Sequence, residues 1–227
     1  MPSSLSWCPW AMFATWARSV DGFDVGVGSP TNPAGIEVST WEALRSSDDR
    51  MALVALAAQG DREPPFHQLA VARAFFNEFS AGGEPPDTLL QRVNDSMYRN
   101  QVQAGDRFVG AAMLVPQGDT VLWSNAGGMQ GTILRRGGTV NEFPDHGPPL
   151  GMMAGFRHEV EEIPIDSGDM ILVLSGGSRG LFRGAVQALS HLDAASAEEV
   201  VARVQKAVRG AQGLDPDEST VLFLRRR

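Results

Sequence analysis

The chain has 227 residues, of which 43% are hydrophobic, and a formal net charge of −8 with a sequence pI near 5.0. This length and content predict one compact domain over residues 1–227, and the acidic balance argues against a nucleic-acid partner, which would need clustered Lys and Arg. Cys8 is the only cysteine, which excludes an internal disulfide and a Cys-based zinc site and fits a reducing cytoplasm.

The N-terminal part of the sequence predicts strands separated by turns. Residues 5–17 are apolar, but no positive charge precedes them, so an export signal is not indicated. No run reaches transmembrane length, and we expect no membrane partner. We predict strands at Trp10–Trp16 and Phe23–Val27 and a surface loop over residues 28–35, which are rich in Gly, Pro and Asn. The continuous apolar run Met51–Ala58 predicts a strand buried on both faces.

Two helices are predicted after this strand. The double proline at 64–65 suits a helix start, because proline lacks only an N–H that the first turn leaves unpaired. Apolar residues then recur at helical spacing through Phe79. After the glycine pair at 82–83, Asp87 is the predicted N-cap of a second helix.

The remainder of the chain returns to strands before it ends in a helix and a last strand. Phe108–Val115 predicts a strand, and four or five further strands follow up to Ser175, with partial alternation over Phe156–Ile165. Asp193–Val208 predicts an amphipathic helix, and Thr220–Leu224 predicts the closing strand. This order of elements indicates an α+β domain with largely antiparallel sheets.

Five short motifs occur in a fixed order in the second half of the chain. They are Asn125-Ala126-Gly127, Gly137-Gly138, Pro149-Leu150-Gly151, Gly168-Asp169 before an apolar strand, and Asp217-Glu218-Ser219-Thr220 near the end. Together they resemble the metal-dependent protein serine/threonine phosphatases of the PPM (type 2C) family, and most closely its sporulation stage II E-like branch. The resemblance covers roughly Met51 to Arg226 and implies a four-layer αββα sandwich, two antiparallel β-sheets flanked by helix pairs.

The resemblance also implies a chemistry. In this family, carboxylates at strand ends hold two divalent metal ions, Mn²⁺ or Mg²⁺, and a metal-bound water attacks a phosphoserine or phosphothreonine. Hard cations need oxygen ligands, and a metal pair lowers the pKa of the attacking water while it neutralises the phosphoryl oxygens. Each family ligand can therefore be compared with the residue that this sequence has in its place.

Two of the three clearest metal ligands are missing. The family motif Asp-x-x-Gly-His-Gly follows the buried strand, and alignment on the prolines places Ala58 at the bridging aspartate, with Asp61 or Glu63 within reach only after a local shift. The motif Thr/Ser-Asp-Gly is replaced by Ser175-Gly176-Gly177, so Gly176 stands at the second aspartate. The third motif keeps its carboxylate at Asp217, which the resemblance makes a vestigial metal ligand.

The N-terminal positions match less closely. Arg18 falls near the arginine that contacts phosphate in the family, and Asp24 falls near an acidic metal position, each with its spacing off by about one residue. Gly110 and Gly128 also replace a threonine and a histidine that are common in the family. For Asp24 and Asp217, the alternative is an ordinary solvated residue at a strand end, and for Arg18 a surface or structural role.

Other sequence features give no stronger site. His67, His146, His158 and His191 lack the spacing of metal ligands, which favours surface or packing roles. The glycine-rich stretch at 175–180 lacks the Lys-Ser/Thr that completes a phosphate-binding loop.

From the resemblance and its departures we predict a pseudophosphatase that needs no metal cofactor and binds a protein partner, a kinase or a phosphoprotein. The alternative is an active Mn²⁺- or Mg²⁺-dependent phosphatase in which Asp61, Glu63, Asp24 or Glu218 replaces the lost ligands. A purely structural subunit is a third class, which the sequence does not separate from the first.

Overall fold

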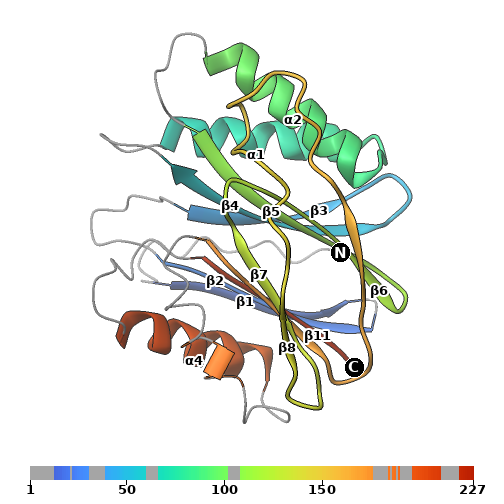
Figure 1. Cartoon of the computed structure of the whole chain (residues 1–227), viewed down its shortest axis with the longest axis vertical. Helices are drawn as coiled ribbons and strands as arrows, with labels where there is room; N and C mark the ends of the chain where they lie inside the picture. Colours follow the sequence, from blue (N-terminus) through green and yellow to red (C-terminus); the bar gives the residue numbers. More distant parts are fainter. Residues whose placement is uncertain are drawn as a thin grey trace, which may run out of the picture.

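The computed structural model describes residues 13–20, 22–30, 39–59, 66–101, 108–175, 184, 186–187, 189, 196–210 and 220–227. These residues form two stacked antiparallel sheets with helices on both outer faces, as Figure 1 shows. The predicted α+β sandwich is confirmed. None of the helices in the described ranges is long and apolar enough to cross a membrane.

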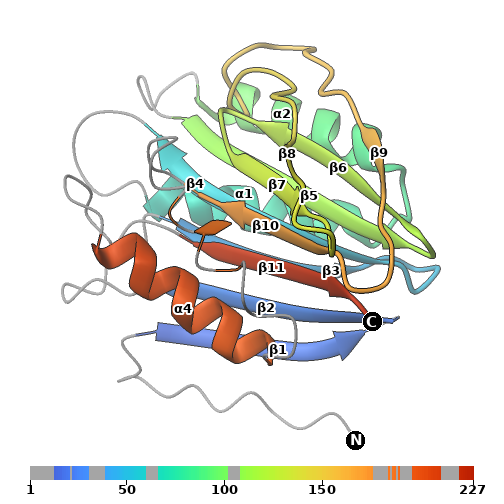
Figure 2. The same cartoon turned by 60° about the horizontal axis from the view of Figure 1, so that its bottom comes forward.

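The first sheet contains six strands in the order β1-β2-β11-β10-β7-β8, and Figure 2 shows helix α4 crossing its outer face. Its strands and helix are β1 (Phe13–Val20), β2 (Phe23–Pro30), β7 (Gln130–Leu134), β8 (Val140–Glu142), β10 (Met170–Leu174), β11 (Val221–Arg226) and α4 (Ala197–Gly210). Helical residues also occur between 184 and 189, where the chain is described only in part.

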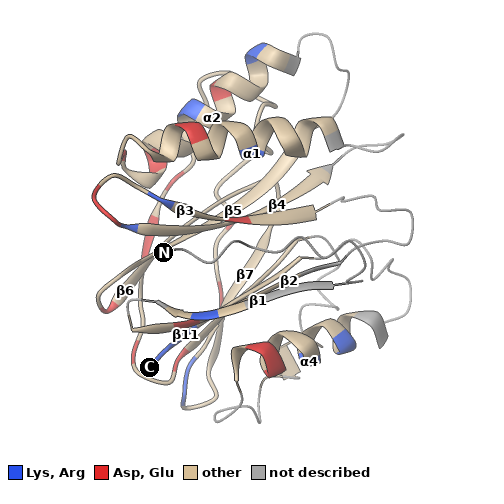
Figure 3. Cartoon of the chain, turned by 180° about the vertical axis from the view of Figure 1, so that it is seen from behind, with Lys and Arg blue, Asp and Glu red and all other residues tan. Residues whose placement is uncertain are grey.

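The second sheet contains five strands in the order β3-β4-β5-β6-β9 and carries helices α1 and α2 on its outer face. Its elements are β3 (Ser39–Arg45), β4 (Met51–Gln59), α1 (Phe66–Ser80), α2 (Pro86–Gln101), β5 (Phe108–Gln117), β6 (Thr120–Ala126) and β9 (Glu161–Pro164). Acidic and basic residues are interspersed over both helical layers and the strand ends (Figure 3).

Strand β4 separates the two apolar layers of the core because successive side chains of a strand point to opposite faces. Leu53 and Ala55 belong to the cluster between the sheets, whereas Val54 and Leu56 pack toward the helices α1 and α2. The predicted burial on both faces of this strand is therefore confirmed, and the alternation fixes which residues can face the other sheet.

Helix α4 lies close to β2 because two glycines of that strand have no side chains. A Cβ at Gly26 would stand 2.8 Å from Val201 Cγ2 and 2.9 Å from the carbonyl oxygen of Ala197, and one at Gly28 would stand 2.4 Å from Gln205 Nε2. Contacts this short force either the helix or the strand to move.

We expect Gly26→Ala to lower the free energy of unfolding by about 1–3 kcal/mol, because the new methyl group meets a backbone carbonyl that has no room to yield. Urea unfolding of the purified chain measures this. Gly137→Ala is the matched control, since a Cβ there meets no atom within 4 Å. Equal stability of the two variants would contradict the close approach of α4.

Several element boundaries differ from the sequence prediction. Strand β3 was not predicted, because Trp, Glu, Ala, Leu and Arg in Ser39–Arg45 favour a helix as much as a strand. Strand β2 continues to Pro30, so the start of the predicted loop is strand, and the rest of that loop lies outside the described residues. Asp87 lies inside the first turn of α2 instead of capping it, since the N–H of Leu89 bonds the carbonyl of Pro85.

Candidate functional site

The two sheets meet at the edge where β4 and β10 end and β11 begins. The hydroxyl of Thr220 lies 2.9 Å from Ser39 Oγ, which links the start of β11 in one sheet to the start of β3 in the other. The N–H of Thr220 also donates to Ser175 Oγ at 2.7 Å, just after β10. We call this set (Ser39, Ser175 and Thr220) the hydroxyl edge, and it is where the resemblance locates the metal site.

The register of β4 determines which of its two adjacent alanines faces the hydroxyl edge. Ser39 pairs with Ala57, and directly opposed residues point to the same face, so Ala57 faces the other sheet with Ser39. Ala57 accordingly belongs to the cluster between the sheets, whereas Ala58 packs toward the helical layer. The position that faces the hydroxyl edge is thus Ala57, and this shift also aligns Gly60 with the first glycine of Asp-x-x-Gly-His-Gly.

The described residues at the hydroxyl edge do not fit a pair of divalent cations. Mn²⁺ and Mg²⁺ sites are built around carboxylate oxygens, but the last three residues of β4 are Ala57, Ala58 and Gln59, none of which has a carboxylate. The hydroxyl oxygens are buried and already hydrogen-bonded. Within the described part of the chain, no group of three or more His, Cys, Asp or Glu residues could hold a metal ion. Gly176 and Asp217 lie outside the described residues, as do Asp61, Glu63 and Glu218.

Asp24 does not lie at this edge, contrary to the prediction. It pairs with Arg225, whereas Gly28 pairs with Val221, so Asp24 is four residues along β2 from the beginning of β11. At about 3.3 Å per residue, this is roughly 13 Å. Its neighbours Phe23 and Val25 face the other sheet, so Asp24 points to the α4 side of the sheet.

Asp24 instead forms an ionic cluster at the opposite end of the sheet. Arg225 and Ser19 each donate a hydrogen bond of 2.7 Å to its carboxylate, and Arg227 lies 3.8 Å away. Burial alone would raise the pKa of Asp24, but these hydrogen bonds and the two arginine charges hold it below its usual value. The carboxylate is therefore ionised and occupied by protein donors.

Arg18 is near Asp24 rather than near the hydroxyl edge. It is exposed and pairs with Val25 on β2. Arg18 and Asp24 both line a shallow cavity of about 280 Å³ beside Ser196, at the start of α4. The structure thus brings these two predicted site residues together, but not with Ala57, Ala58 or Ser175.

The Asn-Ala-Gly motif closes the hydroxyl edge on its other side. Gln130 pairs with Leu174, so the turn between β6 and β7 lies beside the end of β10. Asn125 fixes this turn by donating to the carbonyl of Met129 at 2.8 Å and accepting from the N–H of His146 at 2.6 Å. A cavity of about 390 Å³ opens here, and its lining includes Gln130, Glu142 and Asp145.

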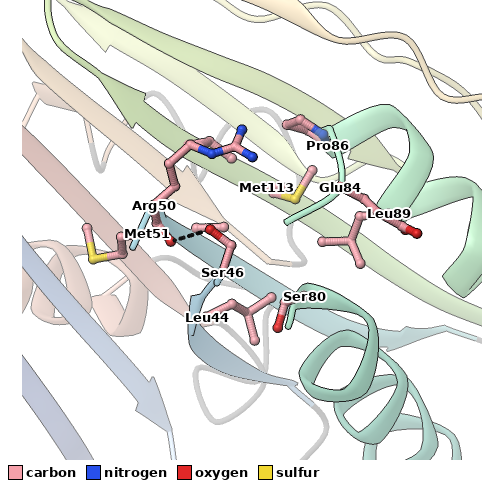
Figure 4. A pocket seen from close by; sticks show the side chains of 11 residues that line it. Leu44, Ser46, Arg50, Met51, Ser80, Glu84, Pro86, Leu89 and Met113 are labelled. Atoms are coloured by element: carbon pink, nitrogen blue, oxygen red, sulfur yellow. Dashed lines mark hydrogen bonds between the residues drawn. The ribbon is translucent and has the colours of Figure 1, made fainter. Parts of the chain in front are cut away.

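A third, smaller crevice lies at the start of β4, away from the hydroxyl edge. Figure 4 shows Leu44, Leu89 and Met113 around it, and the hydroxyl of Ser46 hydrogen-bonded to the carbonyl of Arg50. Its volume of about 30 Å³ holds no more than about two water molecules. It is too small for a phosphorylated side chain.

Comparison with known proteins assigns the family. Residues 47–227 match the family described as stage II sporulation protein E. The chain belongs to this family. Its PP2C-type sandwich agrees with the fold described above. No curated protein sequence matches the chain significantly.

Solved structures share the fold of this stage II sporulation protein E family member at low sequence identity. RsbX in complex with magnesium is 9% identical and has a TM-score of 0.69, with 93% of this chain and 98% of that chain covered. The RsbU and RsbW domains of a Mycobacterium tuberculosis protein are 16% identical, with a TM-score of 0.68 and coverages of 91% and 62%. The PP2C domain with a regulatory-domain fragment of SpoIIE from Bacillus subtilis is 14% identical and has a TM-score of 0.65. The match covers 93% of this chain and 64% of that chain. The chain spans less than two thirds of the last two proteins.

Sequence reasoning missed two features of this family member's site. Ser39 carries no sequence signal, because a hydroxyl residue does not reveal a partner 181 positions away in the chain. The facing position on β4 was missed by one residue, because alignment on the prolines ignored which side of the strand is turned to the other sheet. Counting back three positions from Gly60, taken as the first glycine of Asp-x-x-Gly-His-Gly, would have given Ala57.

Proposed function

We propose that this stage II sporulation protein E domain is a catalytically impaired pseudophosphatase that binds a protein partner. The observation that carries the proposal is the pair of alanines near the end of β4. Ala57 faces the other sheet and Ala58 faces the helices, so neither of the two positions supplies a bridging carboxylate. Gly176 replaces the second ligand in the sequence.

The size of the effect supports loss of metal binding. Removal of a group that merely supports a metal ligand costs about 10- to 100-fold in metal affinity or activity. Loss of two direct ligands should cost at least the square of that, about 10²- to 10⁴-fold. Hydrogen-bonded hydroxyls at Ser39 and Thr220 do not replace the missing negative charge.

A protein partner is the second half of the proposal. One structural neighbour is SpoIIE, a cell fate determinant with a regulatory domain, and another protein contains both an RsbU and an RsbW domain. We place the present chain in a phosphorylation-regulated system of the cytoplasm, where the altered edge binds a kinase or a phosphoprotein without hydrolysing phosphate.

The test is isothermal titration of the purified chain with Mn²⁺ and with Mg²⁺. We expect no binding of two ions per chain at ion concentrations up to about 1 mM, because the charge that holds the ions is missing. Tight binding of two ions per chain would overturn the proposal.

Asp217 is the observation that favours the alternative, an active divergent phosphatase, because the sequence keeps this carboxylate. Asp24 is no longer available as a substitute ligand, since Arg225 and Ser19 hold it at the other end of the sheet. Mn²⁺-dependent hydrolysis of p-nitrophenyl phosphate that disappears in Asp217→Asn would favour the enzyme over the pseudophosphatase.

A further inference from the structure

Three exposed apolar side chains lie on α2 and on the segment that is hydrogen-bonded to it. Among the described residues, the exposed large hydrophobic side chains are Tyr98, Val140, Met152 (49% exposed) and Met153 (52% exposed). Tyr98 is on α2, and the two methionines are on the segment that joins β8 to β9 and rises to α2, as Figures 1 and 2 show. Exposed apolar groups that lie together mark interaction sites on soluble proteins.

The segment with the methionines is fixed to α2 by buried hydrogen bonds. Asn94 is fully buried, donates from Nδ2 to the carbonyl of Met153 at 2.9 Å, and accepts from the N–H of Gly151 at 2.9 Å. Asp95 accepts from the N–H of Gly155 at 2.8 Å. The methionines are thus held outward by their own backbone, which lowers the ordering cost of binding a partner.

A cavity of about 350 Å³ continues this surface toward the start of α2. It lies between Asp87 and Gln91 on α2 and residues 157–160, which run beside the helix. Its lining includes the carboxylates of Asp87 and Glu159 and one arginine, Arg157. The lining therefore carries more negative than positive charge.

His158 lines the same cavity and has an unused acceptor. Its ring is 1% exposed, and Nε2 lies 2.9 Å from the carbonyl oxygen of Pro148. A carbonyl only accepts, so Nε2 carries the proton. Burial lowers the pKa of His158, so the ring is neutral at pH 7 and Nδ1 presents a lone pair. Nδ1 is buried and has no hydrogen-bond partner.

An unpaired buried acceptor costs about 1–3 kcal/mol, and it is satisfied by a ligand that donates a hydrogen bond. The carboxylates of Asp87 and Glu159 favour a donor with positive charge, which is the chemistry of a Lys or Arg side chain. A phosphate group would meet like charge at the same place. The distance along α2 between Asp87 and Asn94 is seven residues, about 10 Å.

We propose that the α2 face (Asp87, Gln91, Tyr98, Met152, Met153 and Glu159) binds a protein segment that presents an apolar side chain and, about 10 Å away, a Lys or Arg. On a helical ligand, these side chains are seven residues apart. The apolar side chain packs on the methionines, whose flexible thioether chains adapt to its shape. The cation enters the cavity between α2 and residues 157–160. This surface is separate from the hydroxyl edge, so the inference goes beyond the proposed function.

The probe is a labelled helical peptide of about 15 residues, with two leucines on one turn and an arginine seven residues away. Its twin carries glutamate in place of arginine. Fluorescence anisotropy with the full chain should give an affinity for the arginine peptide at least about 10-fold higher than for the twin. The imidazole ¹⁵N resonances of His158 should shift with the arginine peptide, because His158 lines the cavity that the arginine enters.

Variants locate the binding on this surface. We expect Met152→Ser with Met153→Ser, and separately Asp87→Asn, to weaken binding of the arginine peptide about 10-fold. Val140→Ser is the matched control, because Val140 is similarly exposed but lies on β8 in the other sheet, and it should leave the affinity unchanged. Thermal unfolding verifies that each variant is folded.

Three outcomes would overturn the inference: no binding of the arginine peptide, equal binding of its twin, or an equal loss in Val140→Ser. The measurement uses no metal and reports on α2, away from Ala57 and Ser175. If the arginine peptide does not bind, the pseudophosphatase proposal is unaffected. If the titration shows binding of two ions, the inference about the α2 face is unaffected.

Discussion

We expect the double variant Ala57→Asp/Gly176→Asp to bind Mn²⁺ at least about 100-fold more tightly than the wild type. Each supporting group of a metal site is worth about 10- to 100-fold in affinity, so two direct carboxylates together should restore at least about 10²-fold. Ala57 faces the other sheet beside Ser39, so an aspartate there points toward the hydroxyl edge. Isothermal titration of Ala57→Asp/Gly176→Asp measures the gain.

The control for this experiment is Ala58→Asp/Gly176→Asp. It adds the same charge, but the side chain at position 58 packs toward the helical layer, so we expect no comparable gain in affinity. An equal gain in both double variants would show that the face of β4 does not matter.

Thermal unfolding tests the same prediction if Ala57→Asp/Gly176→Asp is less stable than the wild type. Ala57 is buried, so its aspartate should lower the thermal unfolding temperature without metal. Metal bound only to the folded state should raise that temperature again as the Mn²⁺ concentration increases. A variant that is destabilised and not rescued by Mn²⁺ would contradict the assignment of Ala57.

The sequence was sufficient for those elements whose pattern is local. The apolar run from Met51 predicted β4 because both faces of that strand are covered, and helical spacing predicted α1. Strand β3 was not predictable in the same way. Its sequence is compatible with a helix, and it is extended because it pairs with β4 along its full length. Pairing between strands overrides a weak local preference.

The candidate site depends on non-local contacts, and there the sequence was less informative. Whether Ala57 or Ala58 faces the other sheet is decided by the pairing with Ser39 and by the hydrogen bond that Thr220 donates to Ser39. Asp24 had nearly the right spacing for a ligand, but the ladder with β11 sets it opposite Arg225. A one-residue shift reverses the face of every side chain in a strand, so motif spacing alone did not place these residues.

The Gly168-Asp169 motif illustrates the same limit, because the sequence marked it as part of the family pattern without indicating its role. Asp169 is 2% exposed and accepts from Arg135 at 2.8 Å and from the N–H groups of Arg136 and Asp166 at 2.9 Å and 3.1 Å. It ties the turn before β10 to the end of β7. Its function is to hold the sheet together, at the opposite end from Ser175.

We expect Asp169→Ala to lower the free energy of unfolding by about 2–4 kcal/mol, because it leaves two backbone N–H groups and the Arg135 guanidinium without their acceptor. The Arg135 side chain is 30% exposed, so water recovers part of the loss. Urea unfolding at pH 7 measures the effect. Asp119→Asn is the control, since Asp119 is exposed on a nearby turn, and it should change stability by less than about 0.5 kcal/mol.

The contribution of Asp169 should also depend on pH. Burial alone would raise the pKa of Asp169, but the hydrogen bonds from Arg135, Arg136 and Asp166 hold it below its usual value. Because the folded-state pKa lies below the unfolded value of about 3.9, the stabilisation is complete above that pH and is lost as pH falls through the folded-state pKa. The stability difference between the wild type and Asp169→Asn should therefore be constant from about pH 7 to 5 and shrink below about pH 4. Subtracting the pH–stability curve of Asp169→Asn from that of the wild type removes the contribution of the other carboxylates. A stability difference that stays constant down to pH 3 would contradict the role of the Asp169–Arg135 ion pair.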